Sequence, residues 1–151
     1  MSEVTVRKMR PSELDLVAEV WWHSFDDSTQ WLRPDQKHPL AEALSFFRTV
    51  VAKRCELWIA MREEAIVGLL AMHGDEVDRL YVATEAQKQG IGGTLLDHAK
   101  ALSPAGLRLV TLQRNTQARL FYERHGFAAF DTGCSAPPEN EPDIWYRWPS
   151  W

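Results

Sequence analysis

Residues 76–94 read EVDRLYVATEAQKQGIGGT and are the most informative stretch of this chain of 151 residues. The stretch opens with apolar Val77, Leu80 and Val82, a composition typical of a strand. A polar loop follows, and the Gly-Ile-Gly-Gly run at 90–93 leads into the amphipathic run TLLDHAKAL. Glycines let a ligand approach the backbone, and the first N–H groups of a helix lack partners within the helix. The stretch therefore predicts a phosphate or pyrophosphate site at a helix N-terminus.

The spacing of the glycines excludes two other phosphate-binding motifs. It is not Gly-x-Gly-x-x-Gly, because the third glycine directly follows the second, and no Gly-Lys-Ser/Thr of a P-loop is present. It matches Gln-x-x-Gly-x-Gly at Gln87, Gly90 and Gly92. Together with Asn115 and the run FYERHGF at 121–127, this motif makes the chain resemble the GCN5-related N-acetyltransferases, or GNAT family, which bind acetyl-coenzyme A there.

The resemblance implies an acetyl-coenzyme A site made largely of backbone groups. Residues 87–94 would cradle the pyrophosphate, and the backbones of Leu80 and Val82 would pair with the pantetheine amides as an added strand would. Asn115 would contact the cofactor, although it could equally cap a helix. Family members often carry proline where this chain has Thr84, a departure that leaves the glycines unaffected. The expected cofactor-binding residues are Leu80, Tyr81, Val82, Gln87, Lys88, Gln89, Gly90, Ile91, Gly92, Gly93, Thr94 and Asn115.

Two catalytic residues follow from the same resemblance. Tyr122 matches the family's general acid, since a phenol of pKa about 10 can give a proton to a thiolate whose acid has a pKa of about 8.5; the alternative is a core tyrosine. Glu76 matches a catalytic glutamate of some members, but a carboxyl pKa of about 4.3 needs raising or a water relay. A solvent-exposed strand end is the other explanation for Glu76. His73 is a runner-up base with a more suitable pKa, and Asp78 shares a strand face with Glu76.

The leading expectation is an N-acetyltransferase that moves an acetyl group from acetyl-coenzyme A to a primary amine of a small molecule, by direct attack in a ternary complex. A non-catalytic acyl-coenzyme A binding module is an alternative, and so is a transferase acting on a protein lysine or N-terminus. A narrow pocket lined by tryptophan would favour a small acceptor, and an open groove would favour a protein.

Aromatic and acidic residues away from the glycine motif are candidates for the acceptor site. They would suit a small cationic amine, although core packing and a solvated loop explain them more simply. These residues are Trp21, Trp22, Phe25, Trp31, Glu139, Glu141 and Asp143.

Composition excludes several other classes of protein. The net charge is −4 without a basic block, which argues against a nucleic-acid partner. No apolar run approaches the length of about 18 residues of a membrane span, and no signal-peptide core is present, so we expect a cytoplasmic protein without membrane association. Cys55 and Cys134 suggest no disulfide, and no cluster has metal-ligand spacing, so no metal is expected. A homodimer is possible through Trp145, Trp148 and Trp151.

The order of expected elements predicts one α/β (α+β) domain over residues 1–151. Its sheet should be mixed but mostly antiparallel, with about six or seven strands and helices on both faces, which is also the fold of the resembled family. In that fold the strands at 76–82 and 107–112 splay apart and the pantetheine arm lies between them. The expected strands span 4–7, 57–61, 65–72, 76–82, 107–112, 127–130 and 144–148, and the expected helices 12–25, with Ser12 as cap, 40–53, 94–102 and 115–126.

Overall fold

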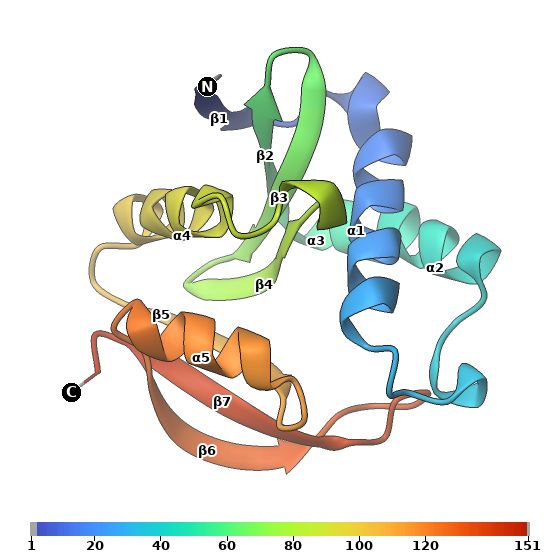
Figure 1. Cartoon of the computed structure of the whole chain (residues 1–151), viewed down its shortest axis with the longest axis vertical. Helices are drawn as coiled ribbons and strands as arrows, with labels where there is room; N and C mark the ends of the chain where they lie inside the picture. Colours follow the sequence, from blue (N-terminus) through green and yellow to red (C-terminus); the bar gives the residue numbers. More distant parts are fainter. Residues whose placement is uncertain (1–2, 151) are drawn as a thin grey trace.

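The computed structural model describes residues 3–150 and confirms the expected order of elements. Seven strands form one sheet in the order β1-β2-β3-β4-β5-β7-β6 (Figure 1). The strands are β1 (Val4–Lys8), β2 (Glu56–Arg62), β3 (Ala65–His73), β4 (Glu76–Val82), β5 (Leu107–Leu112), β6 (Ala128–Cys134) and β7 (Pro142–Trp148). The helices are α1 (Leu14–Ser28), α2 (Leu40–Phe46), α3 (Ala52–Arg54), α4 (Ile91–Leu102) and α5 (Thr116–Arg124).

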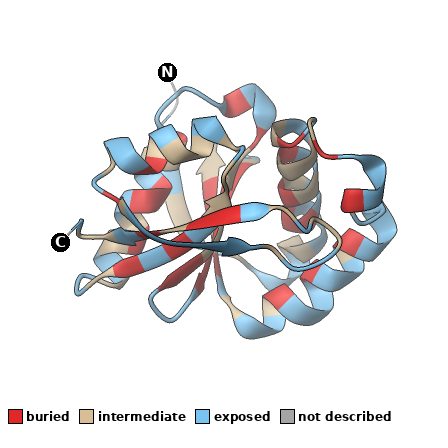
Figure 2. Ribbon diagram, turned by 90° about the horizontal axis from the view of Figure 1, so that it is seen from below, coloured by how far each residue is buried: buried red, intermediate tan, exposed pale blue. Residues whose placement is uncertain are grey.

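Helices cover both faces of the sheet, so the expected fold class is confirmed. On one face α1 and α2 pack over β2 and β3, where Val17, Phe47 and Leu69 are fully buried. On the other face α4 packs over β3 and β4, where Leu70 and Leu95 are fully buried. Leu69 and Leu70 are neighbours on β3 and point to opposite faces, as the alternation of a strand requires. Buried residues follow the inner strands, and exposed residues cover the outer sides of the helices (Figure 2).

The sheet is antiparallel except between β4 and β5, and these two strands separate almost at once. Their parallel pairing is recorded at Glu76 and Arg108, next to a backbone hydrogen bond of 3.0 Å from the Arg108 N–H to the Asp75 carbonyl. In contrast, β5 pairs with β7 along its whole length. The expected splay between β4 and β5 is therefore confirmed, and it leaves an unpaired edge on each strand within the sheet.

The first helix starts later than the sequence predicted, and Ser12 does not cap it. Residues Pro11–Glu13 form a 3₁₀ turn, and α1 then runs three residues beyond Phe25 to Ser28. The Glu13 carboxylate accepts the Arg10 backbone N–H at 2.8 Å and pairs with the Arg7 guanidinium at 2.7 Å. Because Glu13 binds the free backbone donor, no serine cap is needed at this end.

Two further predictions were wrong in detail. The helix expected at 40–53 contains a π-helical segment, Phe47–Val51, between α2 and α3. The strand expected at 127–130 begins at Ala128 and extends four residues further, to Cys134. Exposed, polar residues over 131–134 hide this extension, because the ladder to β7 forms through backbone groups and needs no apolar pattern.

Within residues 3–150, no helix is long and apolar enough to cross a membrane. Of the three tryptophans considered for a dimer contact, Trp145 and Trp148 are partly buried within the chain, with Arg108 and Lys100 over their rings. Trp151 lies outside the described residues.

The rings of Trp58 on β2 and His98 on α4 pack against each other, and each ring has a buried nitrogen without a hydrogen-bond partner among the described residues. Their ring centroids lie 4.3 Å apart, and both Trp58 Nε1 and His98 Nε2 are buried without a hydrogen-bond partner among the described residues. Burial lowers the pKa of His98. The folded protein therefore disfavours a charged His98.

Stability should fall as the pH falls through about 6.5, the ordinary pKa of histidine. Below that pH the unfolded chain binds a proton on His98 that the folded chain does not, so acid favours unfolding. Urea unfolding at several pH values between about 5 and 7 measures this slope. His98→Gln should reduce the slope, while His73→Gln, at an exposed position, should not. Equal slopes in the wild type and His98→Gln would contradict the assignment.

Candidate functional site

The glycine motif forms the start of α4, but the turn is shorter than the sequence predicted. Of the three glycines, Gly90 lies in the turn, with a left-handed φ of 85°, and the helix begins at Ile91. The first backbone hydrogen bond of the helix runs from the Thr94 N–H to the Gly90 carbonyl, at 3.1 Å. The N–H groups of residues 91–93 are left without intrahelical acceptors, as an anion site requires.

Gly92 and Gly93 lie inside the first turn and face α5. A Cβ atom on Gly92 would lie 3.1 Å from Phe121 Cζ, and one on Gly93 would lie 3.1 Å from His125 Nε2. These two glycines therefore let α5 approach the first turn of α4 closely. The sequence explained all the glycines by ligand approach, whereas two of them have this packing role as well.

The other residues expected to bind the cofactor gather around the same end of α4. The Gln87 side chain donates to the Val82 carbonyl at 3.1 Å, and the Gln89 amide oxygen accepts from Arg62. Lys88 has a left-handed φ of 63°. The Thr94 hydroxyl donates to the Gly90 carbonyl at 3.1 Å. These contacts hold the loop between β4 and α4 against the end of β4. The loop and the free N–H groups therefore border the same site.

Backbone groups of β4 are available beside this site. Leu80 and Val82 pair with Leu70 and Gly68 of β3 on one side. On the other side they face the gap toward β5, where no pairing beyond Glu76 is recorded within the described residues. Extended amide groups of a ligand could therefore add to this edge of β4.

Tyr122 is buried on α5, in an aromatic cluster. It is 8 % exposed, and its ring lies 5.7 Å from that of Phe127 and 6.3 Å from that of Tyr146, between centroids. Within residues 3–150 its hydroxyl group has no hydrogen-bond partner. Burial raises the pKa of Tyr122, and the neighbouring Tyr81 raises it further. Tyr122 is thus a core residue with a protonated, unengaged hydroxyl group, which is compatible with both explanations from the sequence.

Asn115 caps a helix, whereas His73 lies exposed at the end of a strand. The Asn115 side chain caps α5 by accepting the Ala118 N–H at 3.2 Å, so one of its two expected roles is confirmed. His73 ends β3 at an exposed position, opposite Glu76.

Glu76 is buried and lies between two arginines. Its carboxylate is 3.3 Å from an Arg108 nitrogen and 3.9 Å from an Arg54 nitrogen. Arg54 also lies 3.5 Å from the Asp78 carboxylate, so Glu76 and Asp78 share a strand face as expected. Asp78 pairs with Arg79 as well. Both carboxylates are therefore occupied by cations, which favours a structural role for them.

Replacing Glu76 with glutamine should lower the free energy of unfolding by about 1–2 kcal/mol, because two partly exposed arginines lose their counter-ion. We expect little change in kcat. Urea unfolding and steady-state kinetics of Glu76→Gln and of the exposed control Glu64→Gln measure the two effects separately. A fall in kcat of about 100-fold at unchanged stability would instead make Glu76 the general base.

A cavity of about 440 Å³ lies beside the gap between β4 and β5. It is bounded by α1, α2, both of these strands and the loop between β6 and β7. Its aromatic wall contains Trp21, Trp22, Phe25, Phe46 and Tyr81, and its acidic residues are Asp78, Glu139 and Asp143. The structure thus brings together most of the aromatic and acidic residues that the sequence proposed for an amine.

Packing is part of the role of these aromatic residues, as the simpler explanation held. Trp21 is buried, with its ring 5.3 Å from that of Phe47. Trp31 does not line the cavity. The Arg114 guanidinium lies over the Trp31 ring, with its Cζ 4.3 Å from the ring centroid. The loop at 137–141 is not simply solvated, because Glu139 is half-buried over the cavity.

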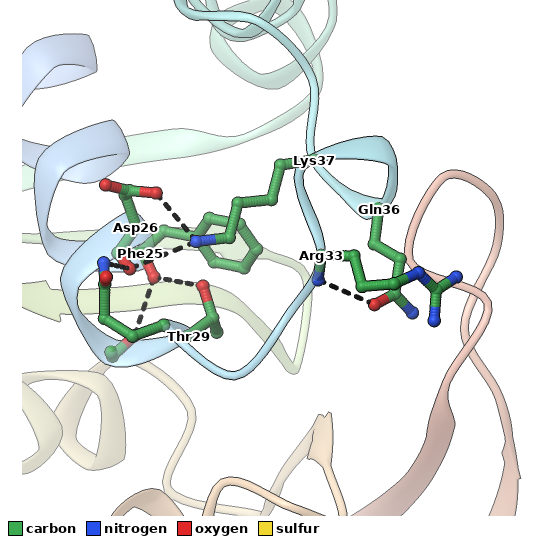
Figure 3. Close-up of polar contacts among 8 residues, drawn as sticks. Phe25, Asp26, Thr29, Arg33, Gln36 and Lys37 are labelled. Carbon is green, nitrogen blue, oxygen red and sulfur yellow. Dashed lines mark hydrogen bonds and ion pairs between the residues drawn. The ribbon is translucent and has the colours of Figure 1, made fainter.

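Gln36 joins the loop between α1 and α2 to the loop between β6 and β7, and both loops border the cavity. The Gln36 amide nitrogen donates to the Glu139 carbonyl at 2.8 Å and to the Glu141 carboxylate at 2.9 Å. Its amide oxygen accepts the Arg33 N–H at 2.9 Å, and Figure 3 shows the Gln36 side chain directed toward the β6–β7 loop. In the same view Lys37 is turned toward Asp26, with 2.7 Å between Nζ and Oδ1.

Sequence reasoning missed Gln36 and also Arg79, which lines the cavity. The Arg79 guanidinium lies 5.1 Å from the Trp21 ring centroid and 5.7 Å from that of Phe46. Gln36 belongs to no local motif, and Arg79 lies within the stretch 76–94 but is not one of its motif residues. Gln36 reaches its partners across more than a hundred residues of chain, a distance that no spacing rule covers.

Comparisons with known proteins identify relatives of the chain. The family model for the acetyltransferase (GNAT) domain matches residues 53–129. A peptidyl-lysine N-acetyltransferase, YjaB of Salmonella typhimurium, is 30 % identical over 125 residues, 82 % of this chain and 83 % of YjaB. The solution structure of apo YjaB from Escherichia coli has a TM-score of 0.83 at 22 % identity and covers 99 % of both chains. PaiA N-acetyltransferase of Thermoplasma acidophilum, in complex with coenzyme A, has a TM-score of 0.73 at 20 % identity, covering 96 % of this chain and 98 % of PaiA.

Proposed function

Since this chain belongs to the GNAT family of acetyltransferases, we propose that it transfers an acetyl group from acetyl-coenzyme A to the side-chain amine of a lysine in another protein. The observation that carries this proposal is the cavity beside the gap between β4 and β5, where aromatic walls and carboxylates meet. Such surroundings stabilise an alkylammonium group. The name of the YjaB relative, a peptidyl-lysine N-acetyltransferase, supports lysine as the source of that group.

The choice of acceptor differs from the leading expectation. The sequence favoured a small molecule, and a cavity lined by tryptophan was expected to agree with that. A lysine side chain is itself a slender cationic amine on an apolar stem, so the same lining accommodates it. The relatives' activity therefore favours the alternative, and small amines become the comparison in the experiment below.

The residues present fit acetyl-coenzyme A. Three free N–H groups at the start of α4, residues 91–93, offer donors to a diphosphate, and the helix dipole favours its charge. The β4 backbone at Leu80 and Val82 offers an edge for the pantetheine amides. When bound, acetyl-coenzyme A supplies an acyl group that is already activated as a thioester.

This chain's own residues would then position the amine and manage protons. The aromatic walls would hold the alkyl stem, and holding two reactants together can itself remove several kcal/mol of barrier. The Tyr122 hydroxyl keeps its proton at neutral pH because burial raises its pKa. It can therefore donate that proton to the departing sulfur, whose thiol has an ordinary pKa of about 8.5.

Thiol release from acetyl-coenzyme A tests the proposal. The wild-type protein is given an N-terminally blocked lysine peptide, an unblocked peptide without lysine, and a panel of polyamines, amino acids and amino sugars. We expect turnover with the blocked lysine peptide. Turnover with small amines alone would overturn the lysine proposal. No turnover in a protein that acetyl-coenzyme A still protects against thermal unfolding would favour a binding module.

A further inference from the structure

The proposed reaction needs a group that receives the acceptor's ammonium and removes a proton from it. Carboxylates near the cavity are the natural candidates, but most are already engaged. Glu76 and Asp78 pair with arginines, as described above. Glu141 accepts from the Gln36 amide at 2.9 Å and lies 3.5 Å from an Arg114 nitrogen. These carboxylates are held by existing partners and are poorly placed to accept a proton.

Asp143 is also held in a fixed place, although one of its oxygens is unsatisfied. It is 8 % exposed, and its Oδ1 has no hydrogen-bond partner among the described residues. That oxygen would lie 3.0 Å from a Cβ atom on Gly133, so it sits against the β6 backbone. The Asp143 carbonyl accepts from Gln113 at 2.9 Å. Asp143 therefore faces the β6–β7 hairpin at the cavity's margin.

Glu139 differs from all of these residues. Its backbone carbonyl is held by Gln36, whereas its carboxylate has no ion pair or hydrogen bond within residues 3–150. The side chain is half-buried and lines the cavity. The residue is thus fixed in position with a free carboxylate, the arrangement that a proton acceptor needs.

The charges around Glu139 match this use. Burial raises its pKa, while the charges of Arg79 and His38 lower it. Arg79 is itself paired with Asp78 and stacked on Trp21, and Lys37 is paired with Asp26. The carboxylate also acts on Tyr81, whose pKa rises to about 12, chiefly through burial. Glu139 and Tyr81 of β4 line the same cavity, together with the rest of the aromatic wall.

We infer that Glu139 is the catalytic residue that binds the acceptor's ammonium group and takes a proton from it. This inference rests on the proposed acetyl transfer. The ammonium gives one proton to the Glu139 carboxylate, and the neutral amine forms the new C–N bond to the acetyl carbon. The C–S bond breaks, and Tyr122 gives its proton to the departing sulfur, so coenzyme A leaves as the thiol. Tyr122 is reprotonated by the second proton of the nitrogen, and Glu139 returns its proton to water.

Glu139→Gln tests the inference, since it keeps the shape and removes the charge. We expect kcat/KM for the amine to fall about 100-fold at neutral pH. The acid limb of the pH profile should move to higher pH, with activity recovering toward the ordinary lysine pKa of about 10.4, because the rate then follows the fraction of free amine, which needs no base. Protection against thermal unfolding by acetyl-coenzyme A should be unchanged.

Two further variants separate a specific effect from a general one. Asp143→Asn removes the other partly free carboxylate of the cavity, and Glu64→Gln removes an exposed charge elsewhere. Wild-type activity in Glu139→Gln, or a loss confined to Asp143→Asn, would overturn the inference. All variants are assayed with the amine that the wild type acetylates. A wild type that ignores lysine but turns over a small amine thus refutes only the proposed acceptor, while the Glu139 comparison still decides the inference.

Discussion

Replacing Tyr122 with phenylalanine should lower kcat by about 10³-fold, because the hydroxyl group is proposed to protonate the departing thiolate. The ring fills the same space, and the hydroxyl group has no hydrogen-bond partner to lose within residues 3–150. The thermal midpoint and the protection by acetyl-coenzyme A should therefore stay close to those of the wild type. Steady-state kinetics with saturating amine, together with thermal unfolding, measure both quantities.

Tyr146→Phe is the matched control for this variant. Tyr146 lies in the same aromatic cluster and is fully buried, but its hydroxyl donates to Glu123 at 2.6 Å and accepts from Arg119 at 3.1 Å. Removing the Tyr146 hydroxyl group should lower the free energy of unfolding by about 1–2 kcal/mol without a comparable loss of kcat. If Tyr122→Phe keeps the wild-type kcat, Tyr122 is only a core residue and the proton reaches the sulfur by another route.

Leu95→Ala should lower the free energy of unfolding by about 3 kcal/mol. Leu95 is fully buried on α4 and packs over Gly68 of β3, where an added Cβ would meet its Cδ1 at 3.0 Å. Leu95 therefore packs directly on the backbone of β3, which moves less readily than a side chain, so the cavity left by the missing side chain should stay largely open. A chain of this size should then unfold about 6–12 °C earlier.

Urea unfolding of Leu95→Ala and Leu102→Ala provides the comparison. Leu102 lies on the same helix but is 42 % exposed, so its loss should change stability by no more than about 0.5 kcal/mol. Saturating acetyl-coenzyme A should recover part of the lost stability in Leu95→Ala, because the ligand binds the folded state. Equal midpoints for the two variants would mean that α4 does not depend on this contact.

Sequence periodicity predicted the strands and helices wherever burial decides them. The strands at 76–82 and 107–112 were predicted with the bounds that the structure gives them, because apolar residues recur along both strands and polar or glycine-containing segments flank them. The π-helical turn at Phe47–Val51 and the extension of β6 were not predicted. The β6 extension depends on backbone hydrogen bonds among exposed residues, which leave no hydrophobic pattern. The π-helical turn keeps buried Phe47 and Val51 at a spacing that an α-helix also gives, so the sequence pattern does not distinguish the two.

The cofactor side of the candidate site was easier to predict than the acceptor side. Gln87, Gly90 and Gly92 lie within a few residues of one another, so a local motif is enough to bring them together. Glu139 and Gln36 meet only because β7 follows β5 in the sheet order and so brings the β6–β7 loop across the ends of α1 and α2. A contact of that range depends on the whole topology. The Glu139 carboxylate becomes informative only once the structure shows it without an ion pair or hydrogen bond within residues 3–150.

The splay between β4 and β5 divides the sheet into two half-sheets, β1–β4 and β5–β7, joined at Glu76 and Arg108. Side chains of both half-sheets, such as Leu70 and Leu109, belong to one hydrophobic core, so packing links the two halves where a hydrogen-bonded ladder does not. A ligand whose amides bridge the gap would add hydrogen bonds between them. Hydrogen exchange at the β4 and β5 amides should then slow together when that ligand binds, and the unliganded protein would carry two strand edges open to pairing with other chains.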